Sequence, residues 1–335
     1  MKYNMDEWLQ EQLKEGEKKA LPILSFPGTQ LIGKNVEELV SDGHLQALCM
    51  KAIADRFPTG AAFSLMDLSV EAEAFGAKVL YSPDEVPTMH GAMIEDEDQA
   101  EALRIPEVGA GRTGECVKGM KEACELITDR PVLAGITGPF SLAGRLLDMT
   151  KIMILCRLEP EMVETVLEKV TIFLISYAKV LKESGVNGIV MAEPAGGLLS
   201  PDLMEEFSNP YVERVRAAVE DESCLFIYHN CGTVLPLKKQ LAEMNVRAYS
   251  FGNAIDIEEM LKSLPSDRLI IGNIDPVGVL RNGAPEKIQA ETTELLERCS
   301  KYKNFVLSSG CDIPPLTPME NLEAFFQAAK EFYGR

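Results

Sequence analysis

The chain has 335 residues, 46% of them hydrophobic, which is enough apolar material for one large α/β domain or two smaller ones. It carries 33 basic and 52 acidic residues, and its formal net charge of −19 argues against nucleic acid or an anionic membrane as a general partner. No run of 18 apolar residues occurs, the first residues lack a hydrophobic signal core, and the eight cysteines are irregularly spaced. These features predict a cytoplasmic protein with reduced thiols.

The first 60 residues are expected to form a helical extension. Residues 6–19 are charged and carry an apolar stripe, which predicts a helix that covers the rest of the fold. Residues 22–29 contain two prolines and predict a loop. Asn35, followed three residues later by Glu38, is a variant of the capping box and predicts the start of further helices.

From residue 61 onward, apolar strands are expected to alternate with helices. The long segment 83–112 is rich in proline, glycine and acidic residues and predicts a loop excursion that serves as a lid or a partner surface. About eight βα units favour a single (β/α)8 TIM barrel over residues 1–335. An open dinucleotide-binding sheet is disfavoured because no Gly-x-Gly-x-x-Gly follows the first strand. The expected strands are 61–68, 78–81, 131–136, 186–191, 226–228, 246–251, 269–272 and 304–308.

His229, Cys231 and Cys311 each follow the end of an expected strand. His229 and Cys231 are two residues apart, so in an extended chain their side chains leave on the same face. In a barrel, the carboxyl ends of all strands share one rim, where Cys311 of the eighth unit can meet the other two. One imidazole and two thiolates suit Zn²⁺ and leave the fourth tetrahedral position free, as in a catalytic zinc site. The alternative is that these cysteines simply pack in the interior, as most lone cysteines do.

Several motifs of the chain resemble the uroporphyrinogen decarboxylase superfamily, and within it the zinc-dependent methylcobamide:coenzyme M methyltransferases. The resemblance covers most of the chain from about residue 20, and its most specific part is the His-x-Cys pair with a distant cysteine. It implies that His229, Cys231 and Cys311 bind zinc. The motifs are Ile136–Arg145, Met191–Ala195, Tyr228–Gly232, Gly272–Gly278 and Ser309–Pro314.

The resemblance implies an enzyme that moves a methyl group from a methylated corrinoid to a thiol such as coenzyme M, through a zinc-bound thiolate. Two cysteine thiolates and a neutral imidazole bring the charge of the zinc site close to zero, so a bound substrate thiolate should stay electron-rich. No Asp-x-His-x-x-Gly run for corrinoid binding occurs in the chain. The methylcobamide is therefore expected to arrive on a partner corrinoid protein that docks at the rim near residues 83–112.

Other strand-end residues are weaker candidates. Glu193 could bind a ligand, take the thiol proton or occupy the open zinc position, or it could simply pair with a basic residue of the rim. Asp67, Asn273 and Asp275 are candidates for cofactor binding, although both aspartates also suit helix caps or turns. Binding of a sulfonate group on the acceptor would require a cationic or amide-rich pocket, to which Arg145, Arg281 and Asn273 could contribute.

Two alternative functions share this fold. A tetrapyrrole decarboxylase of the same superfamily would need no metal but would need cationic residues near the N-terminus, and residues 22–29 contain neither arginine nor lysine. A corrinoid-dependent methyltransferase with a pterin acceptor, in place of a thiol, remains open.

Overall fold

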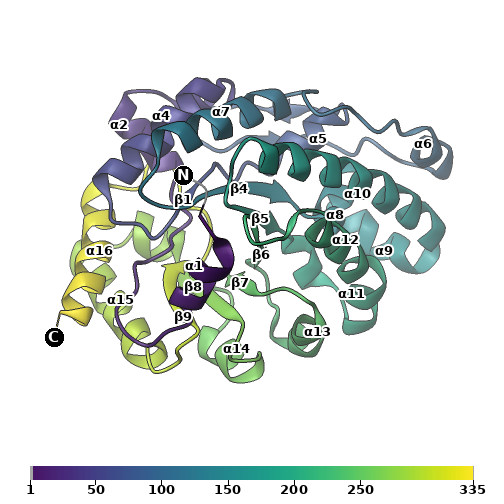
Figure 1. The fold of residues 1–335 in the computed structure, drawn as a ribbon. Helices are drawn as coiled ribbons and strands as arrows, with labels where there is room; N and C mark the ends of the chain where they lie inside the picture. Colours follow the sequence, from purple (N-terminus) through teal and green to yellow (C-terminus); the bar gives the residue numbers. More distant parts are fainter. Residues whose placement is uncertain (1–2, 335) are drawn as a thin grey trace.

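A computed structural model describes residues 3–334, and its centre is a parallel sheet of seven strands (Figure 1). Their order in the sheet follows their order in the chain, so each connection returns over the outer face. This confirms the predicted barrel-type α/β fold. The strands are β1 Ala62–Phe63, β4 Val132–Thr137, β5 Gly188–Ala192, β6 Leu225–Asn230, β7 Ala248–Phe251, β8 Leu269–Ile274 and β9 Phe305–Ser309.

The helices lie mainly on the outer face of the sheet. Those that precede β1 are α1 Met5–Gln12, α2 Thr29–Ile32, α3 Val36–Val40 and α4 Gly43–Arg56. Between β1 and β5 lie α5 Val70–Ala74, α6 Glu97–Ala102, α7 Thr113–Leu126, α8 Pro139–Leu147, α9 Met149–Leu158 and α10 Pro160–Glu183. The remaining helices are α11 Pro201–Phe207, α12 Asn209–Val219, α13 Lys238–Glu243, α14 Ile257–Ser263, the π-helix η4 Pro276–Arg281, α15 Pro285–Cys299 and α16 Met319–Tyr333. Short 3-10 turns occur at η1 Phe26–Gly28, η2 Pro194–Leu198 and η3 Leu235–Leu237.

Alternate residues of each strand pack into two different cores, because successive side chains of a strand point to opposite faces. In β6, Leu225 and Ile227 belong to the inner core of the barrel, whereas Phe226 and Tyr228 pack between the sheet and the outer helices. The next inward position on β6 is therefore residue 229. This alternation decides which strand-end side chains face the barrel axis.

Helix α1 closes the amino-terminal end of the barrel. Its residues Met5 and Leu9 are buried in the inner core, and the Met5 amide donates to the carbonyl of Glu222, which precedes β6. Figure 1 shows α1 lying across the strands in the view. The predicted covering helix is thus present, although it ends at Gln12 rather than Lys19.

The N-terminal segment also forms part of the barrel wall, where the sequence predicts only a helical extension and a loop. Residues 20–24 are buried and lie between β9 and the start of β1. The Leu21 amide donates to the Leu307 carbonyl at 2.8 Å, and the Gly60 amide donates to the Ala20 carbonyl at 2.9 Å. This segment occupies the position of an eighth wall element.

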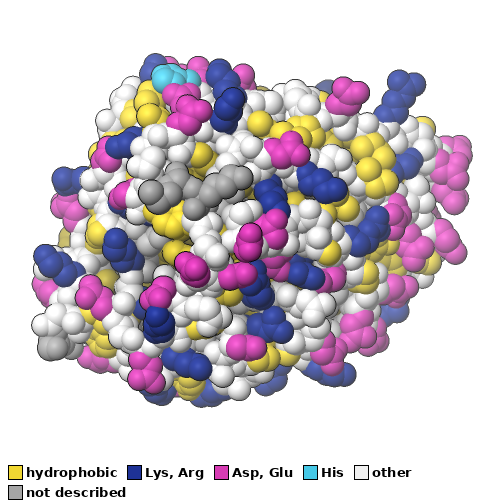
Figure 2. All heavy atoms as spheres, in the orientation of Figure 1, with side chains coloured by type: hydrophobic (Ala, Val, Ile, Leu, Met, Phe, Trp, Pro, Cys, Tyr) yellow, Lys and Arg dark blue, Asp and Glu magenta, His cyan; other side chains and the backbone are white. Residues whose placement is uncertain are grey.

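The strand predicted at residues 78–81 is not in the main sheet, so the count of eight βα units is corrected to seven strands. Its residues form β2 Val79–Leu80, which pairs with β3 Thr88–Met89 in a separate antiparallel hairpin. Val79 is half-buried and Leu80 exposed, whereas central barrel strands are buried on both faces. The predicted excursion 83–112 therefore contains a strand and helix α6, whose first turn carries Glu97 and Asp98. Acidic side chains gather at the edge of the molecule that α6 forms (Figure 2).

Among residues 3–334, no helix combines the length and the apolar character that crossing a bilayer requires.

Candidate metal centre

His229 points into the barrel from the end of β6. It is 1% exposed, and its Nδ1 atom lies 3.0 Å from the hydroxyl oxygen of Ser250, its partner in the register between β6 and β7. Its Nε2 atom is buried and has no hydrogen-bond partner among the described residues. Buried imidazole nitrogens are normally satisfied, so the free Nε2 indicates a position prepared for a ligand.

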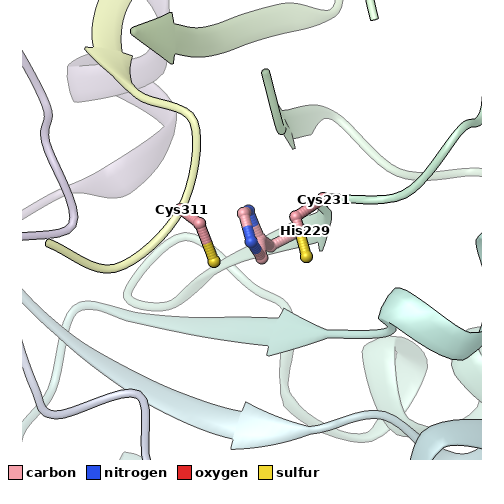
Figure 3. A group of neighbouring side chains, drawn as sticks. All are labelled: His229, Cys231 and Cys311. Carbon is pink, nitrogen blue, oxygen red and sulfur yellow. The ribbon is translucent and has the colours of Figure 1, made fainter. Parts of the chain in front are cut away.

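Cys231 and Cys311 bring two thiols to the same place. Cys231 follows β6 and Cys311 follows β9, and the ligand atoms of both cysteines and of His229 lie within 4.8 Å of one another. Figure 3 shows the imidazole between the two cysteine side chains. Both cysteines are partly exposed, whereas His229 is buried. The structure thus brings together the three residues predicted from sequence.

Two glycines allow the strand-end loops to approach this cluster. A Cβ atom at Gly252 would lie 2.4 Å from the Cα atom of Cys231, and one at Gly310 would lie 2.6 Å from the amide nitrogen of Asn253. Any larger residue would push the loops apart, because such contacts are well below van der Waals distance. The close approach of the loops fixes the separation of the two thiols.

The two thiols interact directly. A hydrogen bond from Cys311 lowers the pKa of Cys231, and the neighbouring His229 acts in the same direction. The same contact raises the pKa of Cys311. A divalent cation would replace the shared proton, and thiolates with imidazole are ligands that Zn²⁺ prefers. The donor set and the free Nε2 atom therefore fit zinc.

Glu193 lies outside this cluster. By strand alternation it follows the inward-facing Ala192 of β5 and turns to the outer side, where it is fully buried. Its carboxylate accepts hydrogen bonds from the amides of Phe140 (2.9 Å) and Ser141 (2.6 Å) at the start of α8. Burial raises its pKa to about 7, although these bonds oppose the shift. Glu193 thus holds α8 against β5, rather than pairing with a basic residue of the rim.

Asp67 forms a buried ionic cluster at the end of β1. Its carboxylate accepts hydrogen bonds from Arg112 and from the Ser69 hydroxyl, and the Arg112 Nε atom donates to Glu73 at 2.7 Å. Arg112 is the last residue of the 83–112 excursion. The cluster therefore fastens this excursion to the barrel.

Asn273 and Asp275 hold the loops after β7 and β8. The Asn273 amide group donates to the carbonyls of Gly252 (2.9 Å) and Ile255 (3.0 Å). The Asp275 carboxylate accepts from the amides of Val277 and Gly278, both at 2.9 Å, and caps η4. Their predicted role in cofactor binding stays a prediction, but Asn273 supports the Gly252 loop that packs on Cys231.

Two residues beside the cluster were not assigned a role from the sequence. Ser250 orients the imidazole. Asn230 donates to the Glu193 carbonyl at 2.5 Å and accepts from the Gly232 amide at 2.8 Å, which fixes the turn after His229 that carries Cys231. In the sequence, the only sign of these roles is position: Asn230 is the last residue of β6, and Ser250 is the last but one of β7. Asp312 also adjoins the cluster, and burial raises the pKa of its carboxyl.

Comparisons with known proteins agree with the fold and with the motifs. The family model described as uroporphyrinogen decarboxylase (URO-D) matches residues 23–332. A methylcobamide:CoM methyltransferase, MtbA, of Methanosarcina mazei is 25% identical over 98% of both chains. The corresponding MtaA enzyme of Methanosarcina barkeri is 30% identical over 71% of this chain and 67% of its own length. A uroporphyrinogen decarboxylase of Coxiella burnetii is 25% identical over 88% of this chain and 82% of its own.

The fold is shared with a solved methyltransferase from Methanosarcina mazei, which has a TM-score of 0.87 and 24% identity over 99% of both chains. The predicted resemblance is confirmed, and with it the prediction of a methyltransferase enzyme. The match of the family model to nearly the whole chain shows that this protein belongs to the uroporphyrinogen decarboxylase (URO-D) family.

Proposed function

We propose that this protein is a zinc-dependent methyltransferase that moves a methyl group from a protein-bound methylated corrinoid to a thiol acceptor such as coenzyme M. The observation that carries the proposal is the convergence of His229, Cys231 and Cys311 within 4.8 Å of one another at the carboxyl ends of β6 and β9. The names of the methylcobamide:CoM relatives support the same donor and acceptor for this chain.

His229, Cys231 and Cys311 would hold the zinc ion, which when bound supplies a Lewis acid that favours the thiolate form of an acceptor thiol. Ser250 fixes the imidazole so that the unpartnered Nε2 atom is left for the ligand position. Both cysteines are partly exposed, and we propose that the acceptor thiol enters from their side. Ser250 of β7 thus orients the imidazole, whereas the two thiols come from the loops after β6 and β9.

The ligand set itself favours transfer of an alkyl group to sulfur. Two cysteine thiolates offset the two positive charges of a divalent ion, and the imidazole adds none. With zinc bound by these three residues, the site would therefore favour an acceptor thiol in its nucleophilic thiolate form. A set with three neutral ligands would hold that thiolate more tightly and make it less reactive.

The methyl donor is proposed to reach the site on a partner protein. The cluster lies at the carboxyl-end rim of the barrel, and Glu85 of the excursion 83–112 pairs with Arg281 of η4, which follows β8 at that rim. A large cofactor such as a corrinoid needs a wide approach, and the rim of a barrel provides it. We propose that the corrinoid protein docks there, near the excursion 83–112.

Metal analysis together with a methyl-transfer assay tests this function. The purified protein is expected to contain one zinc per chain and to convert methylcobalamin to cob(I)alamin when coenzyme M is added, which is followed by absorbance. Cys311→Ala should lose both zinc and activity. Cys124→Ala, which removes another partly exposed thiol on α7, should keep both. Full zinc content and activity in Cys311→Ala would refute the assignment.

Two further arms separate the alternatives. Homocysteine, other thiols and a reduced pterin are assayed beside coenzyme M. Activity with the pterin alone would show that the methyl acceptor is a pterin and not a thiol. Decarboxylation of uroporphyrinogen by the metal-free protein would instead favour the decarboxylase activity after which the Coxiella burnetii relative is named.

A further inference from the structure

A second cavity lies at the end of the barrel opposite the metal centre. Its volume is about 600 Å³, and it lies between residues 17–20, the end of α4 and the second half of α16. The Lys18 ammonium at its edge donates to the carbonyl of Phe305, the first residue of β9, whereas Cys311 follows the last residue of that strand. The length of β9 therefore separates the cavity from the proposed zinc site.

The floor of the cavity is apolar and aromatic. Phe57 and Phe326 are buried, and their rings stack with centroids 5.2 Å apart and an angle of 20° between their planes. Ala20 and Ala329 are also buried and extend the same wall, and Tyr333 lines the cavity beside them. Apolar and aromatic side chains thus line one side of the cavity, as in typical ligand sites.

The rim of the cavity is basic, in contrast to the acidic chain as a whole. Four of the lining residues are cationic and two are acidic, and one acid, Glu323, pairs with Arg56. The whole chain has 52 acidic and 33 basic residues, so this ratio is reversed locally. The cationic lining residues are Lys18, Lys19, Arg56 and Lys330.

Lys18 gives the rim a specific site for an anion. Its half-buried ammonium donates to the carbonyls of Lys303 and Phe305, and no carboxylate among residues 3–334 lies within ion-pair distance of it. An ammonium has three donors, so one is left for a ligand. Burial without a counter-charge also lowers the pKa of Lys18 to about 8, and an anion beside it would offset this cost.

We propose that this cavity is a second ligand site, which takes a planar aromatic molecule that bears an anionic group. The ring would pack against the apolar side of the cavity, which Phe57, Phe326 and Tyr333 line, and the anion would meet the free donor of Lys18. Ligand sites typically enclose 300–1,000 Å³ of space and combine an apolar lining with a few polar anchors, and the cavity meets both conditions. The inference is independent of the proposed methyl transfer.

Binding of small naphthalene compounds tests the proposal. These compounds are fluorescent, and the polarisation of their fluorescence rises when they bind the protein. The probes are 1-naphthyl phosphate, 1-naphthoate and the neutral 1-naphthalenemethanol. We expect saturable binding of an anionic probe with one site per chain, and weaker binding of the neutral probe. Comparison of phosphate with carboxylate shows which anion the rim prefers.

Three variants connect binding to the cavity. Lys18→Met keeps the length of the side chain. It should lower the affinity for the anionic probe by about tenfold, because a charge-assisted contact is lost, and leave the affinity for the neutral probe unchanged. Lys330→Met, at an exposed position of the rim, should weaken the anionic probe by about two- to fivefold without disturbing the fold. Lys179→Met, which changes an exposed lysine at another cavity, is the matched control and should have no effect.

The outcomes are distinguishable from those for the metal centre. Absence of binding at millimolar probe, or unchanged affinity in both Lys18→Met and Lys330→Met, would overturn the proposal. Loss of binding in Cys311→Ala would also overturn it, because the probe would then bind at the barrel mouth. If light scattering shows a dimer that excludes the probe, the cavity is an interface between copies and the ligand proposal is wrong.

Discussion

The Nδ1 atom of His229 and the hydroxyl oxygen of Ser250 lie 3.0 Å apart across two neighbouring strands of the barrel. The contact fixes the ring, and the buried Nε2 atom, which has no hydrogen-bond partner among the described residues, is the nitrogen that we propose binds the metal. Second partners of this kind orient metal-binding histidines and raise their basicity. The first prediction concerns this contact.

Ser250→Ala should weaken zinc binding by about 10- to 100-fold, the usual effect of losing such a partner. A chelator competition measures the affinity directly, apart from activity. Ser176→Ala, which removes an exposed hydroxyl of α10 that bonds within its own helix, is the control. Equal zinc affinity in both variants would show that the register between β6 and β7 suffices to orient His229.

Glu193 should make the stability of the protein depend on pH. Because burial raises its pKa from 4.5 to about 7, the folded state favours the protonated carboxyl. The contribution of Glu193 to the free energy of unfolding is therefore fully present below pH 4.5. It is lost as the pH rises through 7, and the total loss is about 3 kcal/mol. Glu193→Gln should flatten this part of the profile of unfolding free energy, measured with urea between pH 4.5 and 7.5. Glu164→Gln, at an exposed position of α10, should leave the profile unchanged; parallel profiles for the wild type and Glu193→Gln would contradict the prediction.

Arg112 should fasten the excursion 83–112 to the barrel. Arg112→Met leaves the buried carboxylate of Asp67 and the half-buried carboxylate of Glu73 without their cation. Removing the partner of a buried charge costs about 3–5 kcal/mol. We expect limited proteolysis to cut within residues 83–112 in this variant but not in Arg157→Met, where the arginine is exposed on α9. Adding Asp67→Asn to Arg112→Met should restore part of the stability, since it removes one unpaired charge. A loss of zinc in Asp67→Asn alone would instead support a role of Asp67 at the metal centre.

Leu21 should contribute as much to the free energy of unfolding as a buried residue of a regular strand. It is 1% exposed in the wall segment between β9 and β1, so Leu21→Ala should lower the free energy of unfolding by about 2–5 kcal/mol. Leu31→Ala, at a position that is 38% exposed, should change it by less than about 0.5 kcal/mol. Similar small effects in both would show that residues 20–24 do not stabilise the barrel.

The alternation of strands and helices was readable in the sequence because central strands are continuous apolar runs. The spacing of His229 and Cys231 also fixed their common face, since side chains of an extended chain alternate. The strand at residues 78–81 was misplaced for the same reason. A short apolar run predicts a strand but not the sheet to which it belongs, and Leu80 proved to be exposed.

The wall segment 20–24 could not be recognised from the sequence. Proline at residue 22 favours a loop, and only the neighbouring strands supply the carbonyl and amide groups that hold the segment in place. The role of Glu193 was equally hidden, because its position at a strand end does not tell which face of the sheet it leaves.

The sequence by itself determined the barrel class, the family and the identity of the three metal-ligand candidates, because these follow from local periodicity and short motifs. The tertiary structure alone decided that Cys311 meets Cys231, which lies eighty positions earlier, that Ser250 orients His229, and that Glu193 faces α8 rather than the cluster. The physical reason is that contacts between distant segments depend on strand register and on close packing at Gly252 and Gly310, which no local pattern encodes.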